Sequence, residues 1–380
     1  MEFIQFEIVH FPQPAHFQPS YDETLDAYSL ATSSEDHISR ILQLGATEVT
    51  SMIEYIDEIV NGVETPIALR RQSLDLLRKL CGKHGIVPKS CKLDSQELQK
   101  LSDHAVASGG FADIWQGTYQ GQPVALKAFR IYNDGHAFCK EAVVWKALRH
   151  RNITRFYGVD SSIFPVCIVS EWMPWGTIIA FLKERPGANR TMLLVDVAEG
   201  LKYLHDMGLV HGDLKGFNVL INKQERACLS DFGLVALSYD NRLPIITTAS
   251  VTAMSLRYTA PEILDPEHYG LEKAHCSPKS DVYSFSMVMW EVFTGHAPFY
   301  NVSHYAVSRQ IIFGNRPQRP SESTALGLDD DIWSIMQSGW QDEPLQRPSI
   351  ESTIGVLKQV SDRTNPGQLE FPQKWPLQMN

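Results

Sequence analysis

Cysteine is scarce in this chain of 380 residues, which contains six, and no two of them form a C-x-x-C pair. Because closely spaced cysteines are the usual mark of a structural zinc site, their lack argues against one. Cys139, Cys167 and Cys228 fall in segments that we expect to be helix or strand. Buried free thiols in a reducing compartment are the simplest interpretation.

Targeting signals and runs of one charge are lacking as well. The start, MEFIQFEIVH, has neither the basic segment nor the apolar run of a secretory leader. No apolar stretch reaches the roughly 18–20 residues that a membrane span needs. The net charge is -10 and no basic run interrupts it, which argues against binding to nucleic acid or anionic membranes. We therefore expect an intracellular, cytoplasmic protein without a membrane span.

The composition that is present is that of an ordinary globular protein, with 43% hydrophobic and 21% charged residues. Residues 1–33 are rich in proline and aromatics without periodicity, and we expect them to be irregular. Residues 34–100 are predicted to form a helical hairpin and a linker. The first helix is expected to begin at Ser33 or Ser34 and to stop at Asn61-Gly62, and the second to run from Thr65-Pro66 to Gly82.

Apolar residues at helical spacing support this hairpin. They are Val49, Met52, Ile53, Ile56, Ile59 and Val60 in the first helix and Leu74, Leu77, Leu80 and Cys81 in the second. Two interpretations stay open. The hairpin is a support that buries its apolar stripe within this chain, or it is a docking module for a partner.

Two segments further along carry chemistry. VHGDLKGFNVLI, at residues 210–221, spaces Asp213, Lys215 and Asn218 as D-x-K-x-x-N, and LSDFG adds Asp231. Phosphoryl transfer from ATP needs a carboxylate that orients a hydroxyl, a cation near the moving group, and oxygen ligands for magnesium. These four side chains supply all three. A solvated turn is the alternative for HGDLKG alone, and the second segment leaves it little weight.

In this order the two segments resemble the catalytic loop and the DFG segment of protein kinases. The resemblance implies an α+β, bilobal fold with a small β-rich lobe and a large, mainly helical lobe. It assigns residues 101–360 to the kinase domain and 361–380 to an extended C-terminal tail. It also implies ATP and Mg²⁺ as cofactors and proteins as substrates.

The resemblance implies a role for each matching residue. Asp213 would orient the substrate hydroxyl and Lys215 would stabilise the transferred group. Asn218 and Asp231 would ligate Mg²⁺. Lys127, in the V-A-L-K segment, would contact the α- and β-phosphates.

Further positions would surround the nucleotide. Glu141, on the next helix, would hold Lys127. The segment PVCIVSEWMPWGTIIAFL resembles the hinge, where the Glu171 carbonyl and the Met173 N–H would bind adenine and Ser170 would be a small gatekeeper. The remaining expected nucleotide contacts are Ala107, Ser108, Gly109, Gly110, Phe111, Ile114, Ala125 and Leu220. In the glycine-rich loop Ala107 and Ala112 replace two family glycines, so a plain hairpin turn would explain that loop equally well.

Downstream matches complete the set. Ala260-Pro261-Glu262 matches the A-P-E element, whose glutamate is expected to form a buried ion pair with Arg347. Asp281 resembles the aspartate that holds the catalytic-loop backbone. Gly212 stands where many kinases have an arginine that binds a phosphate on the activation loop. We therefore hypothesise that phosphorylation of that loop, at Thr247, Thr248, Ser250 or Thr252, is not the main switch.

The acceptor class follows from a mixture of signals. The D-L-K form and Ser255 are typical of serine/threonine kinases, whereas RYTAPE and WQDEPLQRPS are typical of tyrosine kinases. This mixture resembles the tyrosine-kinase-like group, which mostly phosphorylates Ser and Thr, so the prediction is an ATP-dependent serine/threonine kinase, with dual specificity left open. The alternatives are a pseudokinase scaffold, and an interaction module at residues 34–82 that the kinase domain carries.

Overall fold

The computed structural model describes residues 41–109, 112–130, 135–231, 236–237, 255–363 and 375–378. The chain divides into two units. The first comprises Met1–Lys89 with Gly135–Val143, and the second comprises Ser90–Asp134 with Val144–Asn380. Among the described residues no helix is both long and apolar enough to cross a membrane.

In the first unit, two helices pack against each other, α3 (Ala46–Asn61) and α4 (Ile67–His84). Their facing side chains are the expected apolar ones, since Ile53, Ile56, Leu77 and Leu80 are all 0% exposed. The connection is closed by the Thr65 hydroxyl, which donates to the carbonyl of Ile59 at 2.7 Å. The helical hairpin expected from apolar spacing is thus present.

The expected limits of helix α4 are wrong at both ends, whereas the expected start of the first helix at Ser33 or Ser34 lies outside the described residues. Helix α3 begins at Ala46, because its N-cap is Gly45, which is extended and whose N–H donates to the Glu48 carboxylate at 3.2 Å. Helix α4 begins after Pro66, and Thr65 does not cap it. It runs through Gly82, where a Cβ would overlap the side chain of Lys140, and it ends before Gly85, which adopts a φ of +65°.

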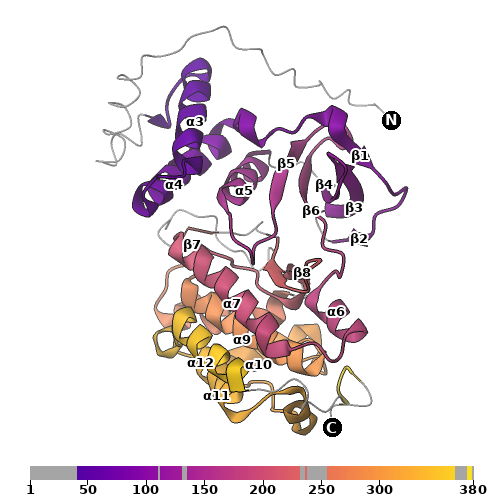
Figure 1. Ribbon diagram of the computed structural model, residues 1–380. Coiled ribbons are helices and arrows are strands. Elements are labelled where there is room, and N and C mark those ends of the chain that lie inside the picture. Colours follow the sequence, from indigo (N-terminus) through magenta and orange to yellow (C-terminus); the bar gives the residue numbers. More distant parts are fainter. Residues whose placement is uncertain are drawn as a thin grey trace, which may run out of the picture. The chain divides into compact units, whose positions relative to one another are not determined.

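The second unit begins with a six-stranded antiparallel sheet in the order β1-β3-β4-β6-β5, with β2 paired to β3 (Figure 1). The strands are β1 (Leu98–Lys100), β2 (Ala107–Ser108), β3 (Ala112–Tyr119), β4 (Gln122–Phe129), β5 (Phe156–Asp160) and β6 (Cys167–Glu171). Strand β1 joins this sheet before residue 101, so the expected start of the kinase domain stays a prediction.

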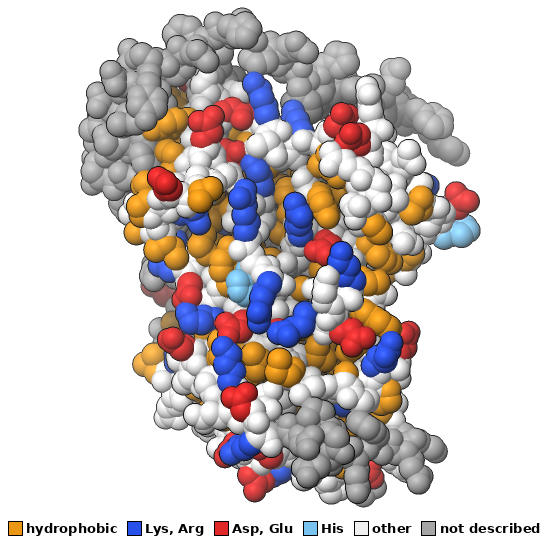
Figure 2. Space-filling view, viewed as in Figure 1, with side chains coloured by type: hydrophobic (Ala, Val, Ile, Leu, Met, Phe, Trp, Pro, Cys, Tyr) orange, Lys and Arg blue, Asp and Glu red, His pale blue; other side chains and the backbone are white. Residues whose placement is uncertain are grey.

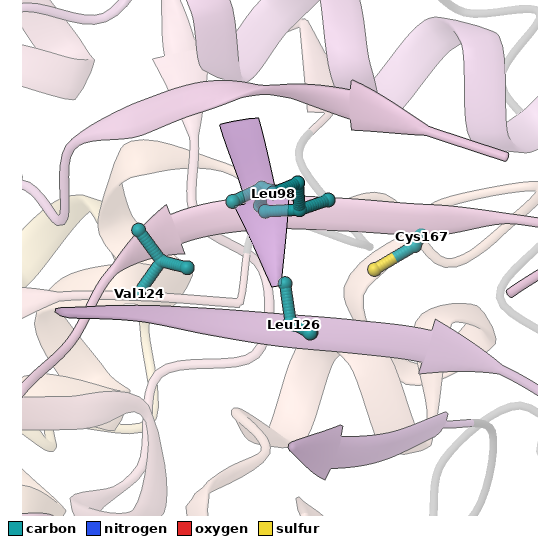
Figure 3. Packing of buried hydrophobic residues seen from close by; sticks show 5 residues of the cluster. Leu98, Val124, Leu126 and Cys167 are labelled. Atoms are coloured by element: carbon teal, nitrogen blue, oxygen red, sulfur yellow. The ribbon is translucent and has the colours of Figure 1, made fainter. Parts of the chain in front are cut away.

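Side chains alternate along β4 with the period of two that a strand imposes. Val124, Leu126 and Ala128 are buried, whereas Ala125 and Lys127 point to the opposite face. Figure 3 shows Leu98, Val124, Leu126 and Cys167 packing together on the buried side. This core fixes the strand that presents Lys127.

The rest of the second unit is mainly helical (Figure 1). Its helices are the end of α5 (Gly135–Ala147), α6 (Ile178–Glu184), α7 (Arg190–Asp206), α8 (Pro261–Leu264), α9 (Pro278–Thr294), α10 (His304–Ile312), α11 (Asp330–Gly339) and α12 (Ile350–Arg363). Its short strands are β7 (Leu209–Val210), β8 (Val219–Ile221), β9 (Ala227–Leu229) and β10 (Ala236–Leu237), paired as β8-β9 and β7-β10. Short 3₁₀ turns are η1 (Lys89–Cys91), η2 (Ser95–Glu97), η3 (Gly216–Asn218), η4 (Ser255–Tyr258), η5 (Pro266–Tyr269), η6 (Ser321–Leu326) and η7 (Pro344–Gln346).

Helix α9 is the buried centre of this helical part. Its N-terminus is fixed by the Ser277 hydroxyl, which accepts from the Ser280 N–H at 3.1 Å, and by Pro278 in the first turn. It ends at Gly295, whose φ of +78° is a left-handed cap. Almost every side chain between these caps is buried, including the charged Asp281 and Glu291. A buried helix that carries two acids needs specific donors for them.

The C-terminal tail contacts this helix. Leu377 is 1% exposed, and its N–H donates to the Thr294 carbonyl at 2.8 Å. The tail therefore packs on the helical part at these residues. On the face seen in Figure 2, basic and acidic side chains are interspersed among apolar ones.

The predicted ion pair between Glu262 and Arg347 is confirmed. Two nitrogens of Arg347 donate to the two carboxylate oxygens of Glu262, both at 2.7 Å, and the Arg347 and Glu262 side chains are 0% and 4% exposed, respectively. Arg347 also donates to the carbonyls of Gln341, Lys279 and Asp342. These bonds join α8, the start of α9 and the loop before α12.

Substituting Glu262→Gln is expected to lower the free energy of unfolding by about 3–5 kcal/mol, because it leaves the buried Arg347 charge without its counterion. Urea unfolding followed by circular dichroism measures the change. The control is Asp206→Asn, which removes an ion pair with Lys202 in which the Asp206 side chain is 51% exposed. This substitution should lower the free energy of unfolding by less than about 1 kcal/mol. Equal effects of the two substitutions would contradict the assignment.

Candidate active site

One carboxylate of α9 accepts hydrogen bonds from the backbone of the catalytic loop. Asp281, 1% exposed, accepts from the backbone N–H of His211 at 2.8 Å and of Gly212 at 2.9 Å. Its oxygen also lies 2.9 Å from His205 Nε2. The predicted role of Asp281 in holding the loop backbone is therefore confirmed. Gly212 meets this carboxylate with a φ of +75°, a conformation that favours glycine.

The loop places an acid, an amine and a hydroxyl together. Lys215 Nζ donates to Asp213 Oδ2 at 2.7 Å and to Ser255 Oγ at 2.9 Å. The Asn218 amide donates to the Asp213 carbonyl at 2.8 Å and to Asp213 Oδ2 at 3.2 Å. The sequence predicted that these four residues share a site, and the structure brings them together.

The sheet contributes the other half of the site through Lys127. Its Nζ donates to Asp231 Oδ1 at 2.5 Å. Asp231 has a φ of +61°, in the left-handed region that Asp tolerates better than most residues. Burial alone would raise the pKa of Asp231, but the charge and hydrogen bond of Lys127, followed by the charges of Lys215 and His211, hold it below its ordinary value. Asp231 is thus kept ionised.

A backbone hydrogen bond connects the segments of Asn218 and Asp231, the two expected magnesium ligands. The Ser230 N–H donates to the Asn218 carbonyl at 2.9 Å, so the bond joins Asn218 to the residue before Asp231. An amide oxygen and a carboxylate are hard ligands that suit Mg²⁺. Within the ranges that the structure describes, no cluster of three His, Cys, Asp or Glu side chains could hold a metal ion. An amide oxygen with a carboxylate fits a Mg²⁺ ion that would take its other ligands from phosphate and water.

Hydrogen bonds, one of them between charged side chains, hold the glycine-rich turn together. Gly109 donates from its N–H to the Ala112 carbonyl at 2.9 Å, and the Ser108 hydroxyl donates to Asp113 Oδ1 at 2.6 Å. Arg130 Nε also donates to Asp113, at 2.7 Å. These bonds, those from Arg130 first, lower the pKa of Asp113 to about 2. Sequence reasoning missed the Asp113–Arg130 pair, which only the opposed strands bring together.

Strand register sets the other expected nucleotide positions. Ile114 lies opposite both Ala107 and Lys127, and Ala125 lies opposite Ser170. Glu171 ends β6 opposite Val124, and Met173 follows it with 5% exposure. Leu220 pairs with Thr177 in an isolated bridge, which connects β8 to the segment after Met173. The adenine contacts themselves stay predictions.

The structure does not test every predicted site residue. Glu141 lies on α5 in the first unit, so its pairing with Lys127 stays a prediction. Gly110 and Phe111 lie outside the described residues, as do the four hydroxyl residues between Thr247 and Thr252.

Sequence reasoning also missed a buried carboxylate behind the catalytic loop. Glu291, on α9, is 4% exposed, and its Oε2 accepts from the Gly216 N–H at 3.1 Å. Burial raises the pKa of Glu291 to about 7, although hydrogen bonds from Tyr258 and Gly216 act to lower it. The one signal in the sequence is an acid inside the apolar run SFSMVMWEVFT.

Glu291 should make stability depend on pH. Its folded pKa of about 7 exceeds the ordinary glutamate value, so the folded state holds this proton longer than the unfolded state. The free energy of unfolding therefore falls as pH rises from about 4.3 to 7, by up to about 3 kcal/mol. The stability of Glu291→Gln minus that of wild type, measured by urea unfolding, should therefore increase as pH rises from 5 to 8. A difference that does not change with pH would contradict the assignment.

Comparison with known proteins now identifies the class. The family model of protein tyrosine and serine/threonine kinases matches residues 101–357, so the chain belongs to this family. The sheet and the helical part of the second unit are accordingly the two lobes of the kinase fold, as the sequence predicted.

Similar proteins include kinases of both acceptor classes. Serine/threonine-protein kinase STY46 of Arabidopsis thaliana is 28% identical over 267 residues, which cover 68% of this chain and 44% of that protein. Megakaryocyte-associated tyrosine-protein kinase of Mus musculus is 34% identical over 272 residues, 69% of this chain and 49% of that protein. Tyrosine-protein kinase Fgr of Mus musculus is 28% identical over 375 residues, 93% of this chain and 69% of that protein. The chain spans less than half the length of the first two.

Proposed function

We propose that this chain transfers the γ-phosphoryl group of Mg-ATP to serine and threonine hydroxyls of proteins. The observation that carries the proposal is the Asp213–Lys215–Ser255 cluster, with contacts of 2.7 and 2.9 Å. A carboxylate and an ammonium held together in a half-buried loop are the groups that this transfer requires.

Asp213 acts on the attacking hydroxyl. The hydroxyl oxygen forms the new bond to the γ-phosphorus, the bond from that phosphorus to the ADP oxygen breaks, and the hydroxyl proton passes to the Asp213 carboxylate. Lys215 holds the carboxylate in place and lies ready to offset charge on the transferred group.

The phosphate end of the site is built around Lys127. As an ammonium on the rigid strand β4, it would bind the α- and β-phosphates, and its bond to Asp231 sets its position. Asn218 and Asp231 would hold Mg²⁺, which neutralises phosphate charge when bound. The backbone around Ser108 and Gly109 would cover the phosphates, with the Asp113–Arg130 pair fixing the base of the turn.

The acceptor class is supported by Ser255. Its hydroxyl accepts a hydrogen bond from Lys215, beside the catalytic loop, as the resemblance to serine/threonine kinases implies.

We propose protein substrates inside the cell, and a docking partner for the α3–α4 hairpin remains a hypothesis. The pseudokinase alternative is favoured by Ala107 and Ala112 in the glycine-rich turn.

The test is phosphate transfer from radiolabelled Mg-ATP to a generic protein substrate by the full chain. Asp213→Asn should lower kcat at least about 100-fold, because the amide cannot take the hydroxyl proton. The KM for ATP should change by less than about twofold, since Lys127 and Asp231 are untouched. Phosphoamino-acid analysis should give phosphoserine and phosphothreonine.

Asp206→Asn, an exposed substitution of the same type, is the control and should leave kcat unchanged. Transfer by Asp213→Asn at the wild-type rate would refute the role of Asp213, and phosphotyrosine alone would refute the acceptor class. ATP binding in a thermal-shift assay without transfer would favour the pseudokinase.

A further inference from the structure

Glu291 connects two segments that also meet at Lys215. One is the catalytic loop, where Gly216 follows Lys215 and donates its N–H to Glu291 Oε2 at 3.1 Å. The other is the turn η4, which begins at Ser255 and ends at Tyr258, a hydrogen-bond partner of Glu291. Since Lys215 Nζ donates to Ser255 Oγ at 2.9 Å, the bonds and the chain form a closed ring.

Gly216 leaves no room for a side chain between the loop backbone and Glu291. A Cβ on Gly216 would overlap the nearer carboxylate oxygen and would lie 2.7 Å from Glu291 Cδ and 2.8 Å from Oε1. Any other residue would push the loop backbone away from Glu291. The close approach of backbone to carboxylate, next to Lys215, is therefore built into the sequence.

Tyr258 is held on its other side too. It is 4% exposed, and its carbonyl accepts from the Ser284 hydroxyl of α9 at 2.8 Å. Burial, followed by the charge of Glu291, raises the pKa of Tyr258 well above its ordinary value, so its hydroxyl stays protonated and donates to the Glu291 carboxylate. Glu291 thus receives one donor from each segment.

A carboxylate is an expensive choice for a purely structural link. An ionised acid that is 4% exposed opposes folding, whereas a neutral glutamine of the same size would not. The carboxylate has an oxygen acceptor for the Gly216 N–H and another for the Tyr258 hydroxyl. A glutamine amide has one oxygen, so its NH₂ group would face the second of these donors.

We propose that Glu291 is a positioning residue for phosphoryl transfer, whose carboxylate fixes Gly216 against Tyr258 and thereby keeps Lys215 bonded to Ser255. This inference rests on the proposed function. Glu291 itself touches no reacting atom, and it acts through the loop that carries Asp213 and Lys215.

The experiment measures kcat, the KM for ATP and the midpoint of thermal unfolding of the full chain at pH 8, for wild type, Glu291→Gln, Tyr258→Phe and the double variant. Glu291→Gln should lower kcat about tenfold through displacement of the loop. The KM for ATP should change by less than about twofold, because the Lys127–Asp231 half of the site is untouched. The unfolding midpoint should not fall. Glu351→Gln, on the exposed side of α12, is the matched control and should behave as wild type.

The double variant separates positioning from general weakening. If both side chains act through one link, Glu291→Gln with Tyr258→Phe should lose no more kcat than Glu291→Gln alone. Wild-type kcat in Glu291→Gln, multiplied losses in the double variant, or a loss of kcat that follows a lower unfolding midpoint would each overturn the inference while leaving the proposed function intact. Failure of the wild type to transfer phosphate would instead overturn the proposed function, and this inference with it.

Discussion

The Asp281 carboxylate is the interaction on which the site depends. It is 1% exposed in the first turn of α9, and it accepts two successive backbone N–H groups, those of His211 and Gly212. These bonds tie the loop that carries Asp213 and Lys215 to α9. The buried helix supplies rigidity, because its own position is set by close packing on all sides.

The same helix serves the site twice. Near its start Asp281 holds the segment before the catalytic acid, and near its end Glu291 receives the N–H of the residue after Lys215. Both are acids that α9 buries at a cost in stability, and both are turned toward backbone donors of one loop. Stability given up in the core is therefore associated with order at the site.

How much of this is readable in the sequence depends on the range of the interaction. The order of the kinase motifs predicted that Asp213, Lys215, Asn218 and Asp231 would meet, because each motif brings its own local geometry. The end of α4 was misplaced at Gly82, since two nearby glycines look alike until Lys140 packs over one of them. Glu291 was not predicted at all, because an acid in an apolar helix acquires a role only from the backbone that folds against it.

The strand alternation of β4 shows the opposite case. The apolar positions Val124 and Leu126 require Lys127 to face away from the core, so its side was readable from a period of two. Its bond to Asp231, at 2.5 Å, was not predicted, and the pairing with Glu141 that the resemblance implies stays a prediction.

The most direct test of the account is the rate of phosphate transfer by Asp281→Asn, measured beside ATP affinity and thermal unfolding of the same samples. An asparagine of equal size keeps one acceptor but turns an N–H₂ toward the second backbone donor. We expect a folded protein that binds ATP as wild type does and transfers phosphate at least about tenfold more slowly. Transfer at the wild-type rate by a folded variant would contradict it, because the loop would then hold its geometry without α9.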